Sequence, residues 1–130
     1  MNNKDLIKDF IEAWNNLDLE KVVNFFAEDI FYHNIPMEPL NGKSEASAFV
    51  DGLKDCDSIN WELIAIAEEG NKVLTERLDN FNFKDGRKIS IPVMGTFEIE
   101  NNKIKKWRDY FDLETYLPQY IFQASFLNLR

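Results

Sequence analysis

The chain has little of the chemistry that binds metals or forms covalent cross-links. Its 130 residues include one cysteine, Cys56, and one histidine, His33. A single cysteine excludes a disulfide framework within one chain and a thiolate metal site. Nothing in the cysteine content indicates an oxidising compartment.

Long apolar runs are also missing. No stretch approaches the roughly 20 apolar residues of a membrane span, and the first residues, Met-Asn-Asn-Lys-Asp, show no apolar segment behind a basic one. These features predict a soluble, cytoplasmic protein that does not bind a membrane.

Basic residues are outnumbered, with 15 Lys and Arg against 23 Asp and Glu, so the net charge is -8. A nucleic-acid surface needs clustered Lys and Arg, and this composition disfavours one. The densest basic run contains Lys105, Lys106 and Arg108, and a solvated strand edge explains it more simply. We expect no nucleic-acid partner.

What the chain does contain is ample apolar and aromatic material. The apolar fraction is 45%, with eleven Phe, four Tyr and three Trp. A chain of this length and composition predicts a single domain, residues 1–130, with one packed core.

Helical patterns come first along the chain and strand patterns follow. Apolar residues recur at helical spacing over residues 6–14, after Asp18, and over residues 43–53. Strand patterns cover residues 30–34, 59–66, 73–83, 89–99 and 104–111, separated by turn residues such as Gly70-Asn71. A last helix is expected after Asp112, limited or kinked by Pro118. This order predicts an α+β fold in which N-terminal helices cover one face of a curved, mostly antiparallel sheet.

Three pairs of residues with polar groups lie two positions apart within the strand patterns. Residues i and i+2 of a strand share a face, so each pair can point the same way. If all three point into one apolar cavity, a set suited to acid–base chemistry on water converges there. The pairs are Tyr32 and Asn34, Arg77 and Asp79, and Trp107 and Asp109.

The segments that carry these pairs resemble the limonene-1,2-epoxide hydrolase family. The matching stretches are Tyr-His-Asn-Ile-Pro-Met at 32–37, Leu-Thr-Glu-Arg-Leu-Asp at 74–79, Pro-Val-Met-Gly-Thr-Phe at 92–97, and Lys-Ile-Lys-Lys-Trp-Arg-Asp-Tyr-Phe-Asp at 103–112. The resemblance implies the cone-shaped α+β fold with a deep apolar pocket that is shared with ketosteroid isomerase, polyketide cyclases and nuclear transport factor two. It also implies a homodimer and a reaction without metal or organic cofactor.

The same resemblance assigns roles to five residues. Asp79 and Asp109 would be the acid–base pair, and Arg77 would bridge them. Tyr32 and Asn34 would help to hold the attacking water. The substrates implied are water and a small or medium apolar epoxide.

The residue chemistry agrees with a one-step hydrolysis. Water must lose a proton as it attacks carbon, and the leaving oxygen must gain one, so an ionised and a protonated carboxyl suffice. Burial and a neighbouring carboxylate favour the neutral form of one acid. We expect Asp109 ionised and Asp79 protonated, with the pair titrating as a unit.

The pocket wall is expected to be apolar. Trp107, which matches a family aromatic beside the site, is expected to contact substrate together with Phe111, Phe81 and Val93. Gly95 on its strand is expected to mark a bend that curves the sheet. The natural epoxide, its stereochemistry and the dimer surface do not follow from the sequence.

Several alternatives stay open. The arginine–aspartate cluster could be a structural salt bridge. The chain could be another acid–base enzyme of this fold, such as an isomerase, cyclase or dehydratase, or a non-catalytic ligand-binding module. An apolar cavity with Arg77 and Asp79 in solvent would favour the binding module. A covalent route is disfavoured because it needs a histidine base, and His33 has the opposite strand phase to Tyr32 and Asn34.

Overall fold

The helices and the five long strands follow one another in the order that the sequence predicts. The computed structural model describes residues 2–122. The elements are α1 (Asn3–Asn15), α2 (Leu19–Asn24), β1 (Phe26–Asn34), β2 (Leu40–Asn41), α3 (Lys43–Asp51), β3 (Cys56–Glu69), β4 (Lys72–Phe83), β5 (Lys88–Glu100), β6 (Lys103–Tyr110), α4 (Leu113–Leu117) and the π-helical turn η1 (Pro118–Phe122).

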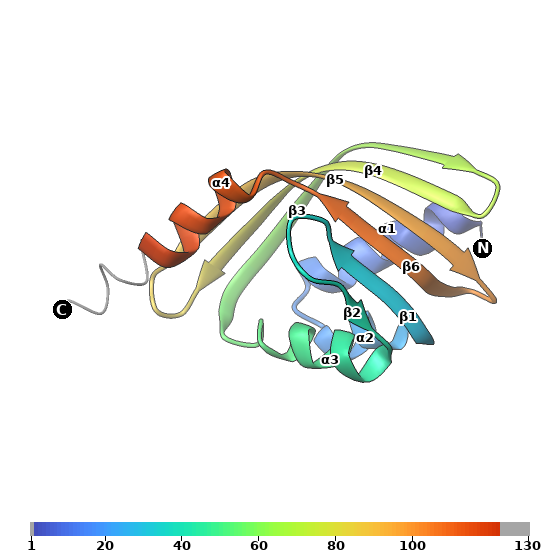
Figure 1. Cartoon of the computed structure of the whole chain (residues 1–130), viewed down its shortest axis with the longest axis horizontal. Helices are drawn as coiled ribbons and strands as arrows, with labels where there is room; N and C mark the ends of the chain where they lie inside the picture. Colours follow the sequence, from blue (N-terminus) through green and yellow to red (C-terminus); the bar gives the residue numbers. More distant parts are fainter. Residues whose placement is uncertain (1, 123–130) are drawn as a thin grey trace.

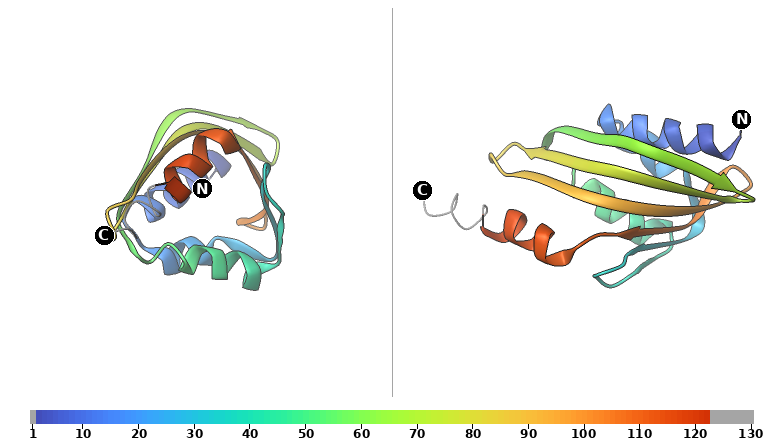
Figure 2. Two further views of the ribbon diagram at one scale, coloured as in Figure 1. Left: turned by 60° about the vertical axis from the view of Figure 1, so that its left-hand side comes forward. Right: turned by 90° about the horizontal axis from the view of Figure 1, so that it is seen from above.

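One sheet of six strands organises the chain, in the order β2-β1-β6-β5-β4-β3. Neighbouring strands are antiparallel except β1 and β6, which are parallel. Figures 1 and 2 show the sheet bent into a curved wall, with α1 and α3 on the side toward which it bends. The predicted α+β fold with helices on one face of a curved sheet is therefore confirmed.

The helices begin where their capping residues predict. The Asn2 side chain accepts from the Asp5 backbone N–H at 2.8 Å, and Asp18 accepts from that of Lys21 at 3.2 Å. Each cap satisfies a backbone donor that has no partner in the first turn of its helix. Asp112 caps α4 in the same way, and α4 ends at Leu117, directly before Pro118, as expected.

Most strands extend further than their sequence patterns indicate, although β6 (Lys103–Tyr110) ends one residue before its predicted limit. β1 was expected at residues 30–34 but starts at Phe26, because the Phe26 backbone pairs with Ile104 at the start of β6. β2 was not predicted at all, and its two residues pair with Phe31 and Tyr32. Pairing with distant residues, rather than local alternation, sets these limits.

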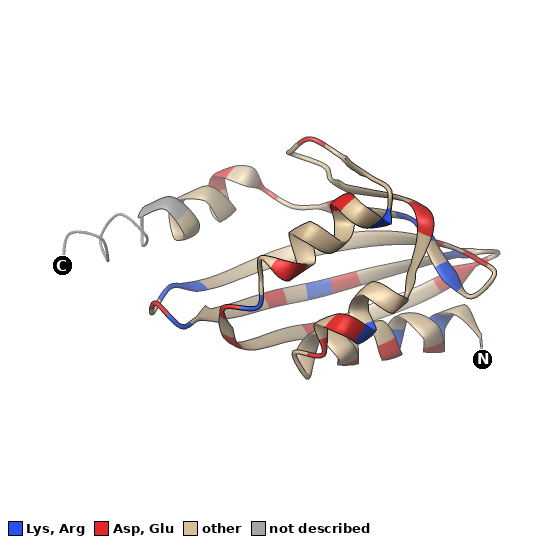
Figure 3. Cartoon of the chain, turned by 90° about the horizontal axis from the view of Figure 1, so that it is seen from below, with Lys and Arg blue, Asp and Glu red and all other residues tan. Residues whose placement is uncertain are grey.

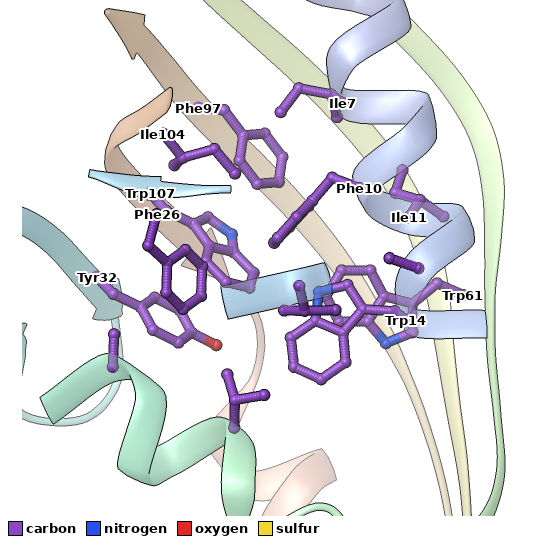
Figure 4. Close-up of a cluster of buried hydrophobic side chains, with 14 of the residues drawn as sticks. Ile7, Phe10, Ile11, Trp14, Phe26, Tyr32, Trp61, Phe97, Ile104 and Trp107 are labelled. Atoms are coloured by element: carbon purple, nitrogen blue, oxygen red, sulfur yellow. The ribbon is translucent and has the colours of Figure 1, made fainter. Parts of the chain in front are cut away.

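The core lies between the concave face of the sheet and α1. Phe10 of α1 sits at its centre, with edge-on contacts to Trp14, Phe97 and Trp107. Figure 4 shows these rings meeting those from β1, β3 and β6. These packed aromatic rings form a rigid, water-free support for the neighbouring side chains on the concave face of the sheet.

Most charged side chains lie on the surface, outside this core. Figure 3 shows acidic residues spread over the helices of the face in view, with basic residues interspersed rather than collected into one stripe. In residues 2–122, no helix is long and apolar enough to cross a membrane.

Candidate active site

Arg77 of β4 joins two carboxylates in the interior of the fold. Its Nε and Nη2 donate to the two oxygens of Asp79 at 3.0 and 2.8 Å. Its Nη1 and Nη2 donate to the two oxygens of Asp109 at 3.3 and 2.9 Å. Arg77 is 0% exposed, Asp79 3% and Asp109 4%. The binding-module alternative predicted these charges in solvent, and their burial counts against it.

Strand pairing explains why these residues meet. Arg77 and Asp79 share the inner phase of β4, and Asp109 has the same phase on β6. β5 lies between them, and its Gly95 pairs directly with Asp109. A methyl group on Gly95 would lie 2.5 Å from both Arg77 Nη1 and Asp109 Oδ1. The absent side chain of Gly95 leaves room for the ion pair to cross β5.

The parallel pairing of β1 with β6 brings Tyr32 and Asn34 close to the carboxylates. Asn34 is the backbone partner of Asp109, and Tyr32 is that of Trp107. The Tyr32 ring stacks on the Trp107 indole with centroids 3.9 Å apart (Figure 4). Trp107 Nε1 donates to Asp109 Oδ1 at 2.7 Å. Trp107 thus holds both the phenol ring and the carboxylate in place.

Burial dominates the acid–base properties of the site. It raises the pKa of Asp79 to about 6, against the opposing effect of Arg77 and with a further push from the Asp109 charge. Burial also raises the pKa of Tyr32 well above its ordinary value, so the phenol stays protonated. For Arg77, burial favours the neutral form, but the two carboxylates outweigh it and hold the pKa above the ordinary value.

These shifts partly agree with the expected protonation states. The pKa of Asp79 moves in the predicted direction, toward a neutral acid. A pKa of about 6 still leaves Asp79 mostly ionised at pH 7, so its protonated form is the minority there. An apolar substrate that displaces water from the cavity would increase that minority, because desolvation favours the neutral carboxyl.

A cavity opens beside the carboxylates, with a volume of about 590 Å³ that includes its mouth. Its polar lining residues are Tyr32, Asn34, Asp79, Asp109 and Tyr116, and the other lining residues are aliphatic or aromatic. Among the predicted substrate-binding residues, the wall contains Phe81, Val93 and Phe111.

Trp107 and Arg77 do not line the cavity. Both are 0% exposed and lie behind the carboxylates that face it. The prediction that Trp107 contacts substrate therefore needs correction: it supports Tyr32 and Asp109 from behind, and Tyr32 covers one face of its ring.

Much of the wall was not foreseen. Trp61 is important among these residues, because its ring lies 4.4 Å from the Arg77 guanidinium carbon and covers one face of that cation. For Trp14, the helical spacing of apolar residues in α1 predicted a core position but did not indicate that the ring also lines a cavity. The unforeseen lining residues are Trp14, Met37, Phe49, Leu53, Trp61, Phe83, Ile89, Ile91 and Tyr116.

His33 takes no part in the cavity. A ring nitrogen lies 2.8 Å from the Met37 carbonyl oxygen, on the opposite phase of β1 from Tyr32. A histidine base for a covalent route is therefore missing from the cavity wall. Within residues 2–122, no three or more His, Cys, Asp or Glu side chains are grouped so that they could hold a metal ion.

Comparison with known proteins places this geometry in context. Residues 1–121 match the family described as limonene-1,2-epoxide hydrolase catalytic domain. The chain is also similar to the epoxide hydrolase EphG of Mycobacterium tuberculosis, with 27% identity over 107 residues, which cover 82% of this chain and 71% of the relative.

Solved structures share the fold. A structure described as an LEH-like epoxide hydrolase from M. tuberculosis superposes with a TM-score of 0.81 and 23% identity, covering 98% of this chain and 95% of the other. A protein described as a SnoaL-like polyketide cyclase from Shewanella denitrificans superposes with a TM-score of 0.79 and 14% identity, covering 94% and 97%. At these identities the structural likeness establishes the fold alone.

Proposed function

Because the chain belongs to the limonene-1,2-epoxide hydrolase catalytic domain family, we propose that it adds water to a small or medium apolar epoxide, giving a vicinal diol in one step. The observation that carries this proposal is the Arg77 bridge between two buried carboxyls at the polar end of an otherwise apolar cavity. The reaction needs only water as co-substrate and uses no organic cofactor.

Asp109 acts as the general base. Its carboxylate faces the cavity beside Asn34 and Tyr32, and the three side chains can fix one water by accepting and donating hydrogen bonds. Fixing the water in advance removes orientational freedom before the barrier is reached. As the water oxygen attacks an epoxide carbon, its proton passes to Asp109.

Asp79 acts as the general acid. The bond between the attacked carbon and the ring oxygen breaks, and that oxygen takes the proton of Asp79. After the reaction Asp109 carries a proton and Asp79 a negative charge, so one proton must return to Asp79. Arg77 contacts both acids, so its positive charge lies beside whichever carboxyl is ionised during the exchange.

Incorporation of oxygen from water separates this function from the alternatives. In ¹⁸O-labelled water, hydrolysis of an apolar epoxide should give a diol with one labelled oxygen, even in the first turnover. A covalent aspartyl route would place unlabelled enzyme oxygen in the first product. Conversion without incorporation of water oxygen would identify an isomerase, cyclase or dehydratase, and binding without turnover a ligand carrier.

The rate should depend on pH through Asp79. Because its protonated form donates to the leaving oxygen, and burial raises its pKa to about 6, kcat/KM should fall about tenfold per pH unit well above pH 6. A pH profile measured with a substrate that has no ionisable group tests this. A rate that stays constant from pH 6 to 9 would remove Asp79 from the acid role.

We also propose that the protein is a homodimer, as the family resemblance implies. The outer face of the sheet carries exposed apolar side chains, including Ile64 (61%), Met94 (50%), Tyr110 (46%) and Leu74 (42%). Exposed apolar patches of this kind mark interaction surfaces. Light scattering should give twice the chain mass, and Met94→Glu should yield the monomer; a wild-type monomer at micromolar concentration would contradict this.

A further inference from the structure

Every hydrogen-bond donor of Arg77 has a partner. A guanidinium carries five N–H donors. Four of them bind the oxygens of Asp79 and Asp109, as described above. The fifth, on Nη1, donates to Thr75 Oγ1 at 3.1 Å. Thr75 is 1% exposed, so no water competes for this contact.

The Thr75 hydroxyl is itself held in place. It donates to the Gly95 carbonyl oxygen on the neighbouring strand at 3.3 Å. A hydroxyl that donates in one direction can accept in another. With its hydrogen on the Gly95 carbonyl oxygen, the Thr75 oxygen therefore has a lone pair free to accept from the guanidinium. Thr75 does not line the cavity, so it cannot touch a substrate there.

Thr75, Gly95 and Asp109 form one row across three strands. Gly95 is the backbone partner of Thr75 on β4 and of Asp109 on β6. A side chain in the middle of this row would fill the space through which Arg77 reaches Asp109. A methyl group there would lie 2.5 Å from Nη1, 2.5 Å from Asp109 Oδ1 and 3.2 Å from Thr75 Oγ1.

We propose that Thr75 and Gly95 are positioning residues for the acid–base pair: the Thr75 hydroxyl fixes the guanidinium from one side, and the space at Gly95 lets it reach Asp109. This inference rests on the proposed function and extends it to two residues that touch neither water nor substrate. Both residues act through Arg77, which sets the relative position of the two carboxyls.

Threonine variants test the first half of the proposal. Thr75→Val keeps the shape of the side chain but leaves one N–H of a buried cation without an acceptor. We expect kcat to fall about tenfold with KM within about twofold, since the cavity wall is unchanged. Thr75→Ser restores the hydroxyl and should recover most of the rate. Thr96→Val makes the same chemical change at a position that does not line the cavity and should leave kcat unchanged.

Gly95→Ala tests the second half. The added methyl group must displace the guanidinium or Asp109, and displacement of about 1 Å in a reacting group can cost about 10²-fold in rate. We expect a loss of that size in kcat in the folded variant. Thr75→Val and Thr75→Ser keep the proposal testable if Gly95→Ala does not fold.

A titration without substrate separates this proposal from the function itself. Carbon-13 NMR of the aspartate carboxyls reports Asp79, assigned by the signal lost in Asp79→Asn. Arg77 opposes the rise in the Asp79 pKa, so a looser guanidinium in Thr75→Val should move the titration midpoint upward by roughly half a unit. That shift would support the proposal even if the wild type hydrolysed no epoxide.

Three results would overturn the proposal. They are an unchanged kcat and an unchanged Asp79 midpoint in Thr75→Val, a Thr75→Ser variant as impaired as Thr75→Val, or a loss expressed wholly in KM. The last two would mean that Thr75 only supports packing or substrate access.

Discussion

Asp109→Asn is expected to lower kcat by about 10³-fold or more, the larger loss of the two aspartate variants. Asparagine cannot accept the proton of the attacking water, which alone costs on the order of 10²–10⁴-fold. A second effect adds to the first. The Asp109 charge helps to raise the pKa of Asp79, so its removal leaves Asp79 more fully ionised beside Arg77. The variant therefore loses its base and also part of its acid.

Asp79→Asn should cost less, about 10²-fold, because it removes the proton donor and leaves the water-activating carboxylate in place. Arg77 then pairs with a single carboxylate, so the buried charges still balance. The residual rate should no longer fall above pH 6, since the group responsible for that decline is absent. Single-turnover rates across this pH range, with an apolar epoxide, measure both effects.

Asp57→Asn provides the matched control. It makes the same chemical change at an exposed position on β3, where a surface substitution changes stability by about 0.5 kcal/mol or less. Circular dichroism and thermal unfolding should show all three variants folded. A folded Asp109→Asn protein with near wild-type diol formation would end the general-base assignment.

The alternation of side chains along strands predicted which residues of each pair share a face. Arg77, Asp79 and Asp109 share one face because residues two apart in a strand do so, and the meander brings β4 close to β6. The placement of Tyr32 and Asn34 depended on a parallel pairing of β1 with β6 between residues 75 positions apart in the chain. No local pattern predicts that pairing, and the roles of all five residues came from the family resemblance.

Trp61 shows where alternation fails. Next to the turn at Gly70 and Asn71, Glu69 pairs with Lys72. If that register continued without a break along the hairpin, Glu62 would pair with Asp79. An irregularity between Leu63 and Ala65 shifts the register, so that Trp61 takes that position and covers Arg77. A shift of one residue moves every side chain beyond it to the other face of the sheet. The sequence gives no clear signal for the shift.

For Gly95 and Trp107, strand position alone does not determine the role that the structure shows. A glycine in a strand can mark a bend or a close approach, and only the positions of Arg77 and Asp109 decide between them. For Trp107, strand phase predicts the inner face but not depth. The indole lies one layer behind the cavity because Tyr32 stacks over it.

Arg77→Lys is expected to abolish most activity, with a kcat loss of at least about 10²-fold, although the positive charge is kept. An ammonium has three donors on a single nitrogen and cannot engage both carboxylates through parallel pairs of hydrogen bonds. One acid would lose its partner, and the two would no longer divide one proton at a fixed separation. Steady-state kinetics on the folded variant measures this, and activity close to wild type would show that charge alone suffices.

Arg77→Met should destabilise the fold in a way that acid reverses. Two buried carboxyls then lie close together without a cation, and losing one partner of a buried ion pair costs about 3–5 kcal/mol. Arg77 opposes the rise in the Asp79 pKa, so without it the folded-state pKa lies still further above the unfolded value. The folded state then binds more protons than the unfolded state, and the deficit in the free energy of unfolding shrinks as pH falls from about 7 toward 4.

Urea unfolding at pH 7.5 and pH 5 measures this reversal, with Arg108→Met as the matched control. Arg108 also pairs with a carboxylate, Glu98 at 2.7 Å, but both side chains are partly exposed. Its loss should cost at most about 1 kcal/mol. A deficit in Arg77→Met that is the same at both pH values would show that the arginine contributes by packing alone, and that the two aspartates do not depend on it to share one charge.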